Sequence, residues 1–185
     1  MPSTLQVDTI KDGSASNTLF EQSGSDWAWG SAPPAGTVLQ VTYNSTSETN
    51  ALTGSYVNYW ENSITLKSAS SDIYLIQNFQ YDIADAKAFG VEIYRNSSAT
   101  VTTSHTAVWT KNVKDGTGPH TFNITGGSIK NTSSITAKDT LSGFSVGDTL
   151  YYGLFARYYN ATAVNFPSND TEDGVFSLIL MEVQK

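Results

Sequence analysis

The stretch from Gly174 to Val183 is apolar at both odd and even positions and carries a single charge, on Glu182. A strand with one solvated face alternates apolar and polar residues, so this stretch predicts a strand that is covered on both faces. One face would meet a second sheet, and the other would meet a neighbouring element or another subunit. The two faces consist of Val175, Ile179, Met181 and Val183 on one side and of Phe176, Leu178 and Leu180 on the other.

The stretch from Thr149 to Tyr159 is also apolar on both faces and predicts a second strand of the same kind. Shorter runs of β-branched and aromatic residues, separated by Gly, Ser, Asn and Asp, predict the remaining strands. These runs fall at residues 37–43, 55–67, 73–81, 89–95, 106–110, 121–125 and 134–138. About eight to ten short strands with closely spaced turns are typical of sandwiches and jelly rolls. The sequence therefore predicts an all-β fold, a jelly-roll-like antiparallel β-sandwich over residues 36–185.

Residues 1–35 differ from the rest of the chain, because their apolar groups are sparse and lie among Asp, Ser, Gly and Asn. A Pro-rich joint, Ser31–Gly36, separates them from the predicted sandwich. The entropy cost of ordering this segment exceeds what so few apolar side chains return on burial. We therefore expect an extended N-terminal attachment arm, held by a partner or packed across its own domain. Its candidate partner-binding residues are Leu5, Val7, Ile10, Leu19, Phe20, Trp27 and Trp29.

Composition narrows the classes of partner. The 185-residue chain has a net charge of −7, and its ten Lys and Arg residues form no cluster that could neutralise phosphates, so a nucleic-acid partner is not expected. No apolar run approaches the ~18–20 residues that a membrane span needs. There is no cysteine, which excludes disulfides and thiolate metal sites, and the N-terminus lacks the features of a signal peptide. We expect a protein made in a cytoplasm.

Candidate chemistry is sparse. The two histidines, His105 and His120, lie in polar surroundings without the spacing of a metal site. Asn169–Gly174 resembles a calcium loop only superficially, because Thr171 occupies a ligand position, and an acidic turn is the preferred interpretation. Asp82 and Asp85 are a candidate carboxylate pair, with Glu61 or Glu92 as a candidate glycosidase acid, but solvated edge charges are the better explanation. We therefore predict no enzyme activity, no cofactor and no metal.

Tyrosine and tryptophan are plentiful, and Tyr151, Tyr152, Tyr158 and Tyr159 suit either a subunit interface or stacking on sugar rings. The interface is the preferred interpretation, and its predicted residues are Tyr151, Phe155, Phe176, Leu178 and Leu180. Tyr158 and Tyr159 are the candidate glycan contacts.

Three stretches carry distinctive motifs: the opening Ser3–Gly13, the stretch Gly36–Val41 and the close Phe176–Val183. They resemble tail-fibre-like and virion appendage proteins of marine bacteriophages. The middle of the chain departs from these proteins, with only Ser70–Ile73 standing where they carry a Ser-Ser-Lys-Ile phrase. The resemblance implies a virion component, a trimer with an N-terminal attachment segment and a β-rich distal knob.

The resulting hypothesis is a bacteriophage virion structural protein, a trimeric fibre or appendage subunit. Its arm would anchor it to a capsid, portal, neck or tail protein, with Trp27 and Trp29 as hot spots. Its knob would face the host surface, where a host glycan is a candidate partner. Two alternatives stay open at this point: a capsid decoration (cement) protein that stabilises the shell, and a carbohydrate-binding module.

Overall fold

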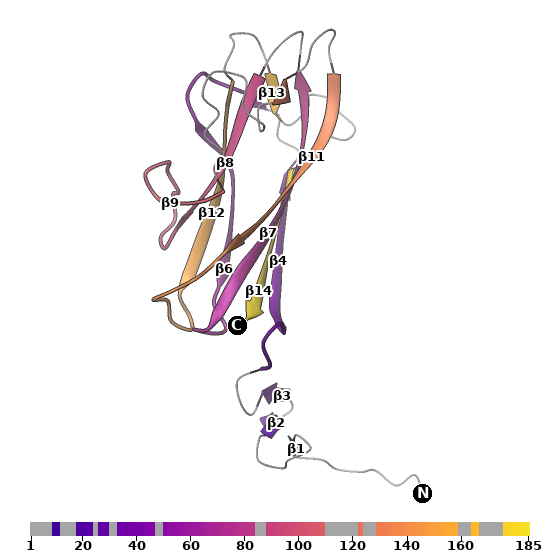
Figure 1. Ribbon diagram of the computed structural model, residues 1–185, viewed down its shortest axis with the longest axis vertical. Coiled ribbons are helices and arrows are strands. Elements are labelled where there is room, and N and C mark those ends of the chain that lie inside the picture. Colours follow the sequence, from indigo (N-terminus) through magenta and orange to yellow (C-terminus); the bar gives the residue numbers. More distant parts are fainter. Residues whose placement is uncertain are drawn as a thin grey trace, which may run out of the picture.

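The structure is a computed structural model, and it describes residues 9–11, 18–23, 26–29, 33–46, 50–83, 88–109, 122–123, 129–158, 164–166 and 176–185. In the described part of the chain, strands account for all regular secondary structure (Figure 1). No helix in that part is long and apolar enough to cross a membrane.

Two antiparallel sheets form the body of the molecule. The first contains β4 (Val38–Thr46), β14 (Phe176–Gln184), β7 (Ser71–Ile83) and β11 (Ile129–Asp139) in that order, and is extended at one end by β13 (Val164–Phe166) and β5 (Asn50–Ala51). The second contains β6 (Val57–Thr65), β12 (Thr149–Tyr158) and β8 (Ala88–Asn96), followed along the far edge of β8 by β9 (Thr106–Trp109) and β10 (Phe122–Asn123).

The strand order defines the fold as a jelly roll. The eight main strands along the chain are β4, β6, β7, β8, β9, β11, β12 and β14. Numbered one to eight along the chain, these strands follow the order 1-8-3-6 in the first sheet and 2-7-4-5 in the second sheet. Apart from β8 and β9, which pair within the second sheet, successive strands alternate between the two sheets in the Greek-key manner of a jelly roll. The predicted all-β, jelly-roll-like sandwich is confirmed.

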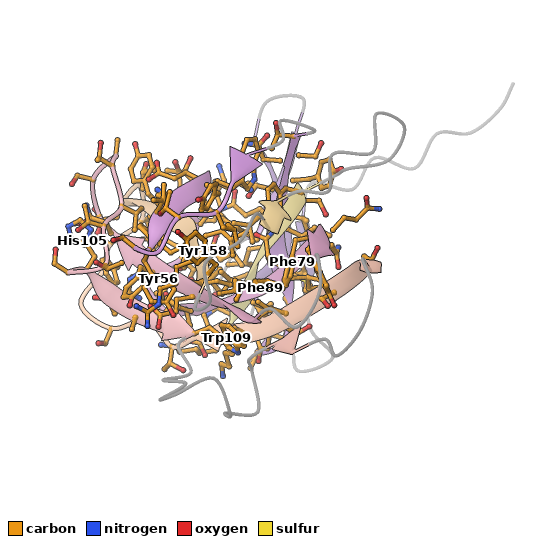
Figure 2. The ribbon with its side chains drawn as sticks, turned by 90° about the horizontal axis from the view of Figure 1, so that it is seen from above. Tyr56, Phe79, Phe89, His105, Trp109 and Tyr158 are labelled. Atoms are coloured by element: carbon orange, nitrogen blue, oxygen red, sulfur yellow. The ribbon has the colours of Figure 1, made fainter. Side chains whose placement is uncertain are left out.

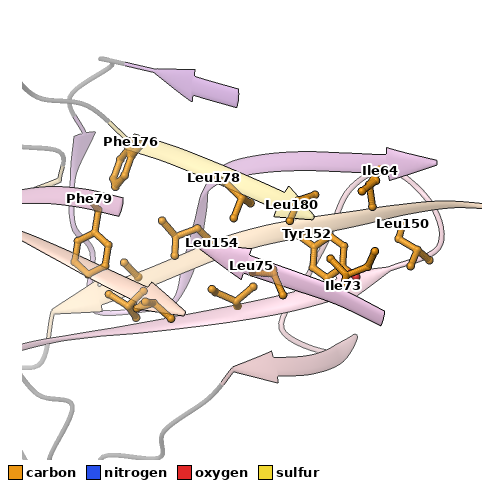
Figure 3. Packing of buried hydrophobic residues seen from close by; sticks show 14 of the residues in the cluster. Ile64, Ile73, Leu75, Phe79, Leu150, Tyr152, Leu154, Phe176, Leu178 and Leu180 are labelled. Atoms are coloured by element: carbon orange, nitrogen blue, oxygen red, sulfur yellow. The ribbon is translucent and has the colours of Figure 1, made fainter. Parts of the chain in front are cut away.

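The core lies between the two sheets (Figure 3). β7 contributes Ile73, Leu75 and Phe79, and these side chains face alternate residues of β12 across the sandwich. The fully buried residues that Figure 3 labels on the other strands are Ile64, Leu150, Tyr152, Leu154, Phe176, Leu178 and Leu180. Each such apolar side chain contributes about 1.5–3 kcal/mol on burial. At one end of the core Phe79 meets Phe89 edge to face, with ring centroids 6.4 Å apart (Figure 2).

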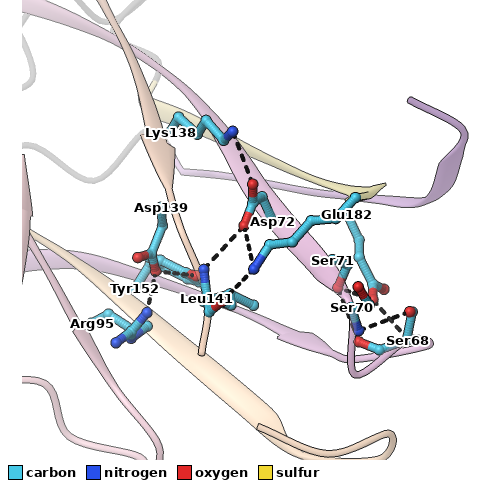
Figure 4. A network of polar contacts seen from close by, with 11 residues as sticks. Ser68, Ser70, Ser71, Asp72, Arg95, Lys138, Asp139, Leu141, Tyr152 and Glu182 are labelled. Atoms are coloured by element: carbon cyan, nitrogen blue, oxygen red, sulfur yellow. Dashed lines mark hydrogen bonds and ion pairs between the residues drawn. The ribbon is translucent and has the colours of Figure 1, made fainter. Parts of the chain in front are cut away.

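A buried carboxylate fixes the end of the last strand. Glu182 has no exposed surface, and its oxygens accept hydrogen bonds from the backbone N–H groups of Lys67 and Ser68 at 2.9–3.0 Å. The Ser71 hydroxyl donates to it at 2.8 Å and the Gln40 amide at 2.6 Å. This carboxylate therefore joins β14 to β4 and to the turn that precedes β7, as Figure 4 shows for the serines of the turn.

Two further carboxylates tie the same end of the sandwich together (Figure 4). Asp72 forms ion pairs with Lys138 at 2.9 Å and with Lys185 at 3.0 Å. Asp139 accepts hydrogen bonds from Arg95 at 2.7 Å and from the Tyr152 hydroxyl at 2.8 Å, across the core. Burial, and then the Asp139 carboxylate, raise the pKa of Tyr152, so its hydroxyl stays protonated and remains a donor.

The N-terminal segment contains a sheet of its own. β1 (Thr9–Lys11), β2 (Thr18–Ser23) and β3 (Asp26–Trp29) pair antiparallel in chain order and share no ladder with the two sheets of the sandwich. Figure 1 shows them beyond the end at which the chain enters β4. The sequence predicted an extended arm and did not predict these hairpins. Their register places Ile10, Phe20 and Trp29 in one row.

The joint between this segment and the sandwich is tied to the C-terminal strand. Gly36 adopts a φ of +87°, a conformation that favours glycine, and its N–H donates a hydrogen bond of 2.8 Å to the carbonyl of Gln184. The Thr37 N–H closes a turn onto the carbonyl of Pro34 at 3.1 Å. The chain therefore passes from the Pro-rich joint into β4 in a defined direction.

Candidate functional site: the outer face of the β4–β14–β7 sheet

The outer face of the first sheet carries a continuous apolar surface. Register pairing aligns Val41, Met181 and Tyr74 in one row and Tyr43, Ile179 and Ile76 in the next. Val38 pairs with Val183 at the end of the sheet. We call these eight residues the outer face: Val38, Val41, Tyr43, Tyr74, Ile76, Ile179, Met181 and Val183. Its β4 side chains are strongly exposed, Val38 at 49%, Val41 at 56% and Tyr43 at 63%, and the others are half-buried among them.

The exposure of Val41 and Tyr43 has a specific cause in the polarity of β4. The intervening residues Gln40, Thr42 and Asn44 point inward, towards the free edge of β6. They donate hydrogen bonds to three backbone carbonyls of β6: Gln40 to Thr65 at 2.5 Å, Thr42 to Ser63 at 3.3 Å and Asn44 to Glu61 at 3.4 Å. Because side chains alternate between the faces of a strand, this polar row directs the apolar residues of β4 to solvent.

The rim of the outer face is polar. Along β11 the side chains of Thr132, Ser134 and Thr136 are exposed, and Lys138 ends the row. The Lys138 ammonium lies 5.5 Å from the centre of the Tyr74 ring and is neutralised by its ion pair with Asp72. An apolar centre free of charges, bordered by a polar rim, is the usual anatomy of a protein–protein interface.

Four of the five predicted interface residues lie in hydrophobic cores of a single subunit, so their assignment to a subunit interface is wrong. Phe176, Leu178 and Leu180 are fully buried between the two sheets. Phe155 is 4% exposed and packs edge to face against Tyr94, with ring centroids 5.3 Å apart. A side chain without exposed surface cannot contact a second subunit.

The two apolar faces of the last strand explain this misassignment. β14 lies between β4 and β7, so one of its two apolar faces must close the core. That face carries Phe176, Leu178 and Leu180, and the residues left outside are Ile179, Met181 and Val183. Tyr151, the fifth predicted residue, is half-buried beside Phe155.

The predicted arm and glycan residues are only partly covered by the structure. Leu5 and Val7 lie outside the described residues, and so does Tyr159. Ile10, Leu19, Phe20, Trp27 and Trp29 lie in β1, β2 and β3. Tyr158 is half-buried against the core, and its N–H donates to the carbonyl of Thr53 at 2.9 Å (Figure 2). Its role as a glycan contact stays a prediction.

The candidate acids and ligands do not converge on a catalytic cleft within the described residues. Glu61 accepts hydrogen bonds from Asn58 at 2.5 Å and from the Val101 N–H at 2.7 Å. Glu92 is buried and accepts from the Tyr94 hydroxyl at 2.5 Å. Burial, followed by this carboxylate, raises the pKa of Tyr94. No group of three metal-ligating side chains occurs in the part of the chain that the structure describes.

The other candidates are scattered or lie outside the described residues. Asp82 lies in β7, whereas Asp85, His120 and the acidic turn Asn169–Gly174 fall outside. His105 is structural in the β8–β9 loop, because its Nδ1 accepts the Thr102 N–H at 2.8 Å.

One pocket was not predicted from the sequence. It has a volume of about 420 Å³, lies where the β8–β9 loop (residues 97–105) meets the β11–β12 loop, and is lined by Arg95, Asn96, Ser97, Ser104, His105, Thr106 and Phe144. Within this loop Val101 is buried at 2% exposure, and Thr100 adopts a φ of +72°, which is strained for a β-branched residue. The run of small hydroxyl residues from Ser97 to Ser104 was the available sequence signal.

Comparison with known proteins finds likeness at the level of structure. No protein-family profile matches the sequence. No curated protein matches it either. A chain in the solved structure of infectious bursal disease virus, Gx strain, aligns with 98% of this chain at 10% sequence identity and a TM-score of 0.39. This chain spans 46% of the length of that chain. The jelly-roll assignment rests on the strand order described above.

Proposed function

We propose that this chain is a structural subunit of a virus particle, a bacteriophage fibre or appendage protein that assembles as a homotrimer. Residues 1–30 anchor it to a capsid or tail protein, and the jelly roll forms a knob that contacts the host. The observation that carries the proposal is the exposed outer face. Contiguous apolar surfaces of this kind on soluble proteins mark interaction sites, so this molecule is suited to assembly.

The fold and the resemblance support the same function. Jelly rolls build viral capsid domains as well as lectins, although a fold alone does not decide function. Both ends of the chain resemble phage appendage proteins, including Phe176–Val183, which supplies β14. The N-terminal sheet, which forms its own ladder before the joint at Gly36, is the candidate anchor.

Deletion of residues 1–30 tests the anchor. The truncated protein, which keeps the joint and β4, is expected to remain soluble and to keep its oligomeric state, but to be absent from purified particles. Full-length protein with Trp27→Ala and Trp29→Ala should show the same loss, and Val146→Glu, an exposed substitution in the β11–β12 loop, should incorporate normally. Normal incorporation of the truncated protein contradicts the proposal. Particles that lose heat stability but not host adsorption when the protein is absent would instead identify a decoration protein.

The pocket at the β8–β9 loop favours carbohydrate binding as a second candidate function. Its lining combines three hydroxyls, the Asn96 amide, the His105 imidazole and the Arg95 guanidinium, which lies 4.9 Å from the centre of the Phe144 ring. These polar groups could hydrogen-bond the hydroxyls of a sugar. Glycan-array binding that is lost in Thr106→Val, but retained in Tyr158→Ala, would assign the ligand to this pocket. Loss in Tyr158→Ala alone would assign it to the predicted aromatic site. An array without any signal contradicts this second function.

A further inference from the structure

We infer that the outer face is covered by the same face of other copies of this chain. The inference rests on the proposed function, because it names the partner and the surface through which the subunits assemble. It replaces the predicted interface residues by Val41, Tyr43, Ile179 and Met181, which lie at the centre of the face.

Charge selects a second copy as the occupant. The chain carries a net charge of −7, so two copies repel each other over most of their surfaces. The outer face contains no ionisable carboxylate or amine among its eight residues, and Lys138 at its rim is already paired with Asp72. Contact through this face therefore buries no like charges, which would be costly. A basic partner, by contrast, would find no acidic side chain there to recognise.

The outer face is held rigid before assembly. The hydrogen bonds from Gln40, Thr42 and Asn44 to β6 fix the edge strand. At the end of the face, the bond from the Gly36 N–H to the Gln184 carbonyl fixes the start of β4. A rigid surface loses little conformational entropy when it binds, so more of the apolar burial appears as affinity.

The size of the face indicates what else takes part. Three strands spaced by ~4.8 Å and about eight residues long at ~3.3 Å per residue cover roughly 400 Å² of flat area. A standard interface buries about 800 Å² per partner. The outer face therefore supplies about half of a stable contact. The N-terminal segment joins the sandwich at the start of β4, the edge strand of this face (Figure 1). We assign the remainder of the contact to that segment.

Single-cysteine labelling tests the inference directly, because the chain contains no cysteine. Val41 and Val146 are matched positions, 56% and 63% exposed in the subunit. In the full-length oligomer, Val41→Cys is expected to react with a maleimide at least about tenfold more slowly than Val146→Cys. The protection should disappear when Met181→Glu is added. Equal labelling rates of the two cysteines in the oligomer overturn the inference.

Native mass measurement supplies the second readout. Val41→Glu should raise the dissociation constant of the oligomer on the order of a hundredfold, the effect of losing an interface hot spot, whereas Val146→Glu should leave it unchanged. Circular dichroism should show that both variants are folded.

An oligomer that persists in Val41→Glu overturns the inference but not the proposed function, which particle incorporation tests separately. A dimer lost in Val41→Glu supports the surface and overturns the trimer. Protection of Val41→Cys only within particles assigns the face to another virion protein and overturns the inference.

Discussion

The Thr42 hydroxyl donates a hydrogen bond of 3.3 Å to the backbone carbonyl of Ser63 and so joins the edge strand of one sheet to the edge of the other. Gln40 and Asn44, two residues away on either side, make equivalent contacts with Thr65 and Glu61. These bonds occupy carbonyls at an open sheet edge, the kind of edge that proteins protect from unwanted pairing. They also reverse the usual polarity of a sandwich strand, because the apolar residues of β4 face outward and its polar residues face inward.

Replacing Thr42 by Val tests the hydrogen bonds between β4 and β6. The substitution keeps the shape of the side chain but removes the donor to Ser63, and the free energy of unfolding should fall by about 1 kcal/mol. Urea unfolding measures the change. Thr136→Val, at an exposed position of β11, is the matched control and should change stability by less than about 0.5 kcal/mol. A stabilised Thr42→Val protein would mean that the inner side of β4 prefers apolar contacts.

Glu182→Gln should be much more damaging. The carboxylate accepts hydrogen bonds from two backbone N–H groups, a hydroxyl and an amide, and an amide nitrogen in its place turns one acceptor into a donor facing donors. The expected loss is about 2–3 kcal/mol, measured by urea unfolding. Lys67→Gln changes the charge of the same turn at an exposed side chain and should have little effect. Equal stability of both variants would contradict a structural role for the Glu182 carboxylate.

Asp72 predicts a pH dependence with a defined sign. Burial alone would raise its pKa, but the hydrogen bonds from Lys138, Lys185 and the Leu141 N–H outweigh burial and lower the pKa below its usual value. A lowered pKa in the folded state adds stability above the unfolded pKa of about 3.9, and this stability is lost as the pH falls through the folded value. Asp72→Asn should therefore be less stable than the natural protein at pH 7, and the difference should shrink below about pH 4. A difference that is constant from pH 7 to pH 3 would contradict the ion pairs.

Gly153→Ala tests the close approach of the β8–β9 loop to β12. An added Cβ would lie 2.9 Å from Phe155 Cε2 and 3.0 Å from Val101 Cβ, closer than van der Waals contact allows. Thermal unfolding should show a loss of about 1–3 kcal/mol. Gly54→Ala is the control, because the nearest atom to its added Cβ is 3.8 Å away, and it should be neutral or slightly stabilising. A neutral Gly153→Ala variant would show that the loop does not pack closely on β12.

Runs of β-branched and aromatic residues, separated by turn residues, were enough to predict the eight main strands and the jelly-roll-like class, but not β5 or β13. These signals are local, because such residues suit a pleated backbone whose side chains alternate between its two faces. The same pattern identified the last strand as apolar on both faces. It did not predict the hairpins of residues 9–29, because their few apolar residues lack a regular period.

Which face of the last strand is inside was decided only by the tertiary structure. Phe176–Leu178–Leu180 and Ile179–Met181–Val183 are equivalent in the sequence, and the choice depends on how β14 is inserted between β4 and β7. The burial of Phe155 beneath the β8–β9 loop and the reversed polarity of β4 depend in the same way on distant partners, Val101 and the β6 carbonyls. The sequence by itself determined that two apolar faces exist, whereas the packing of the sheets, through contacts between residues far apart along the chain, determined which one remains on the surface.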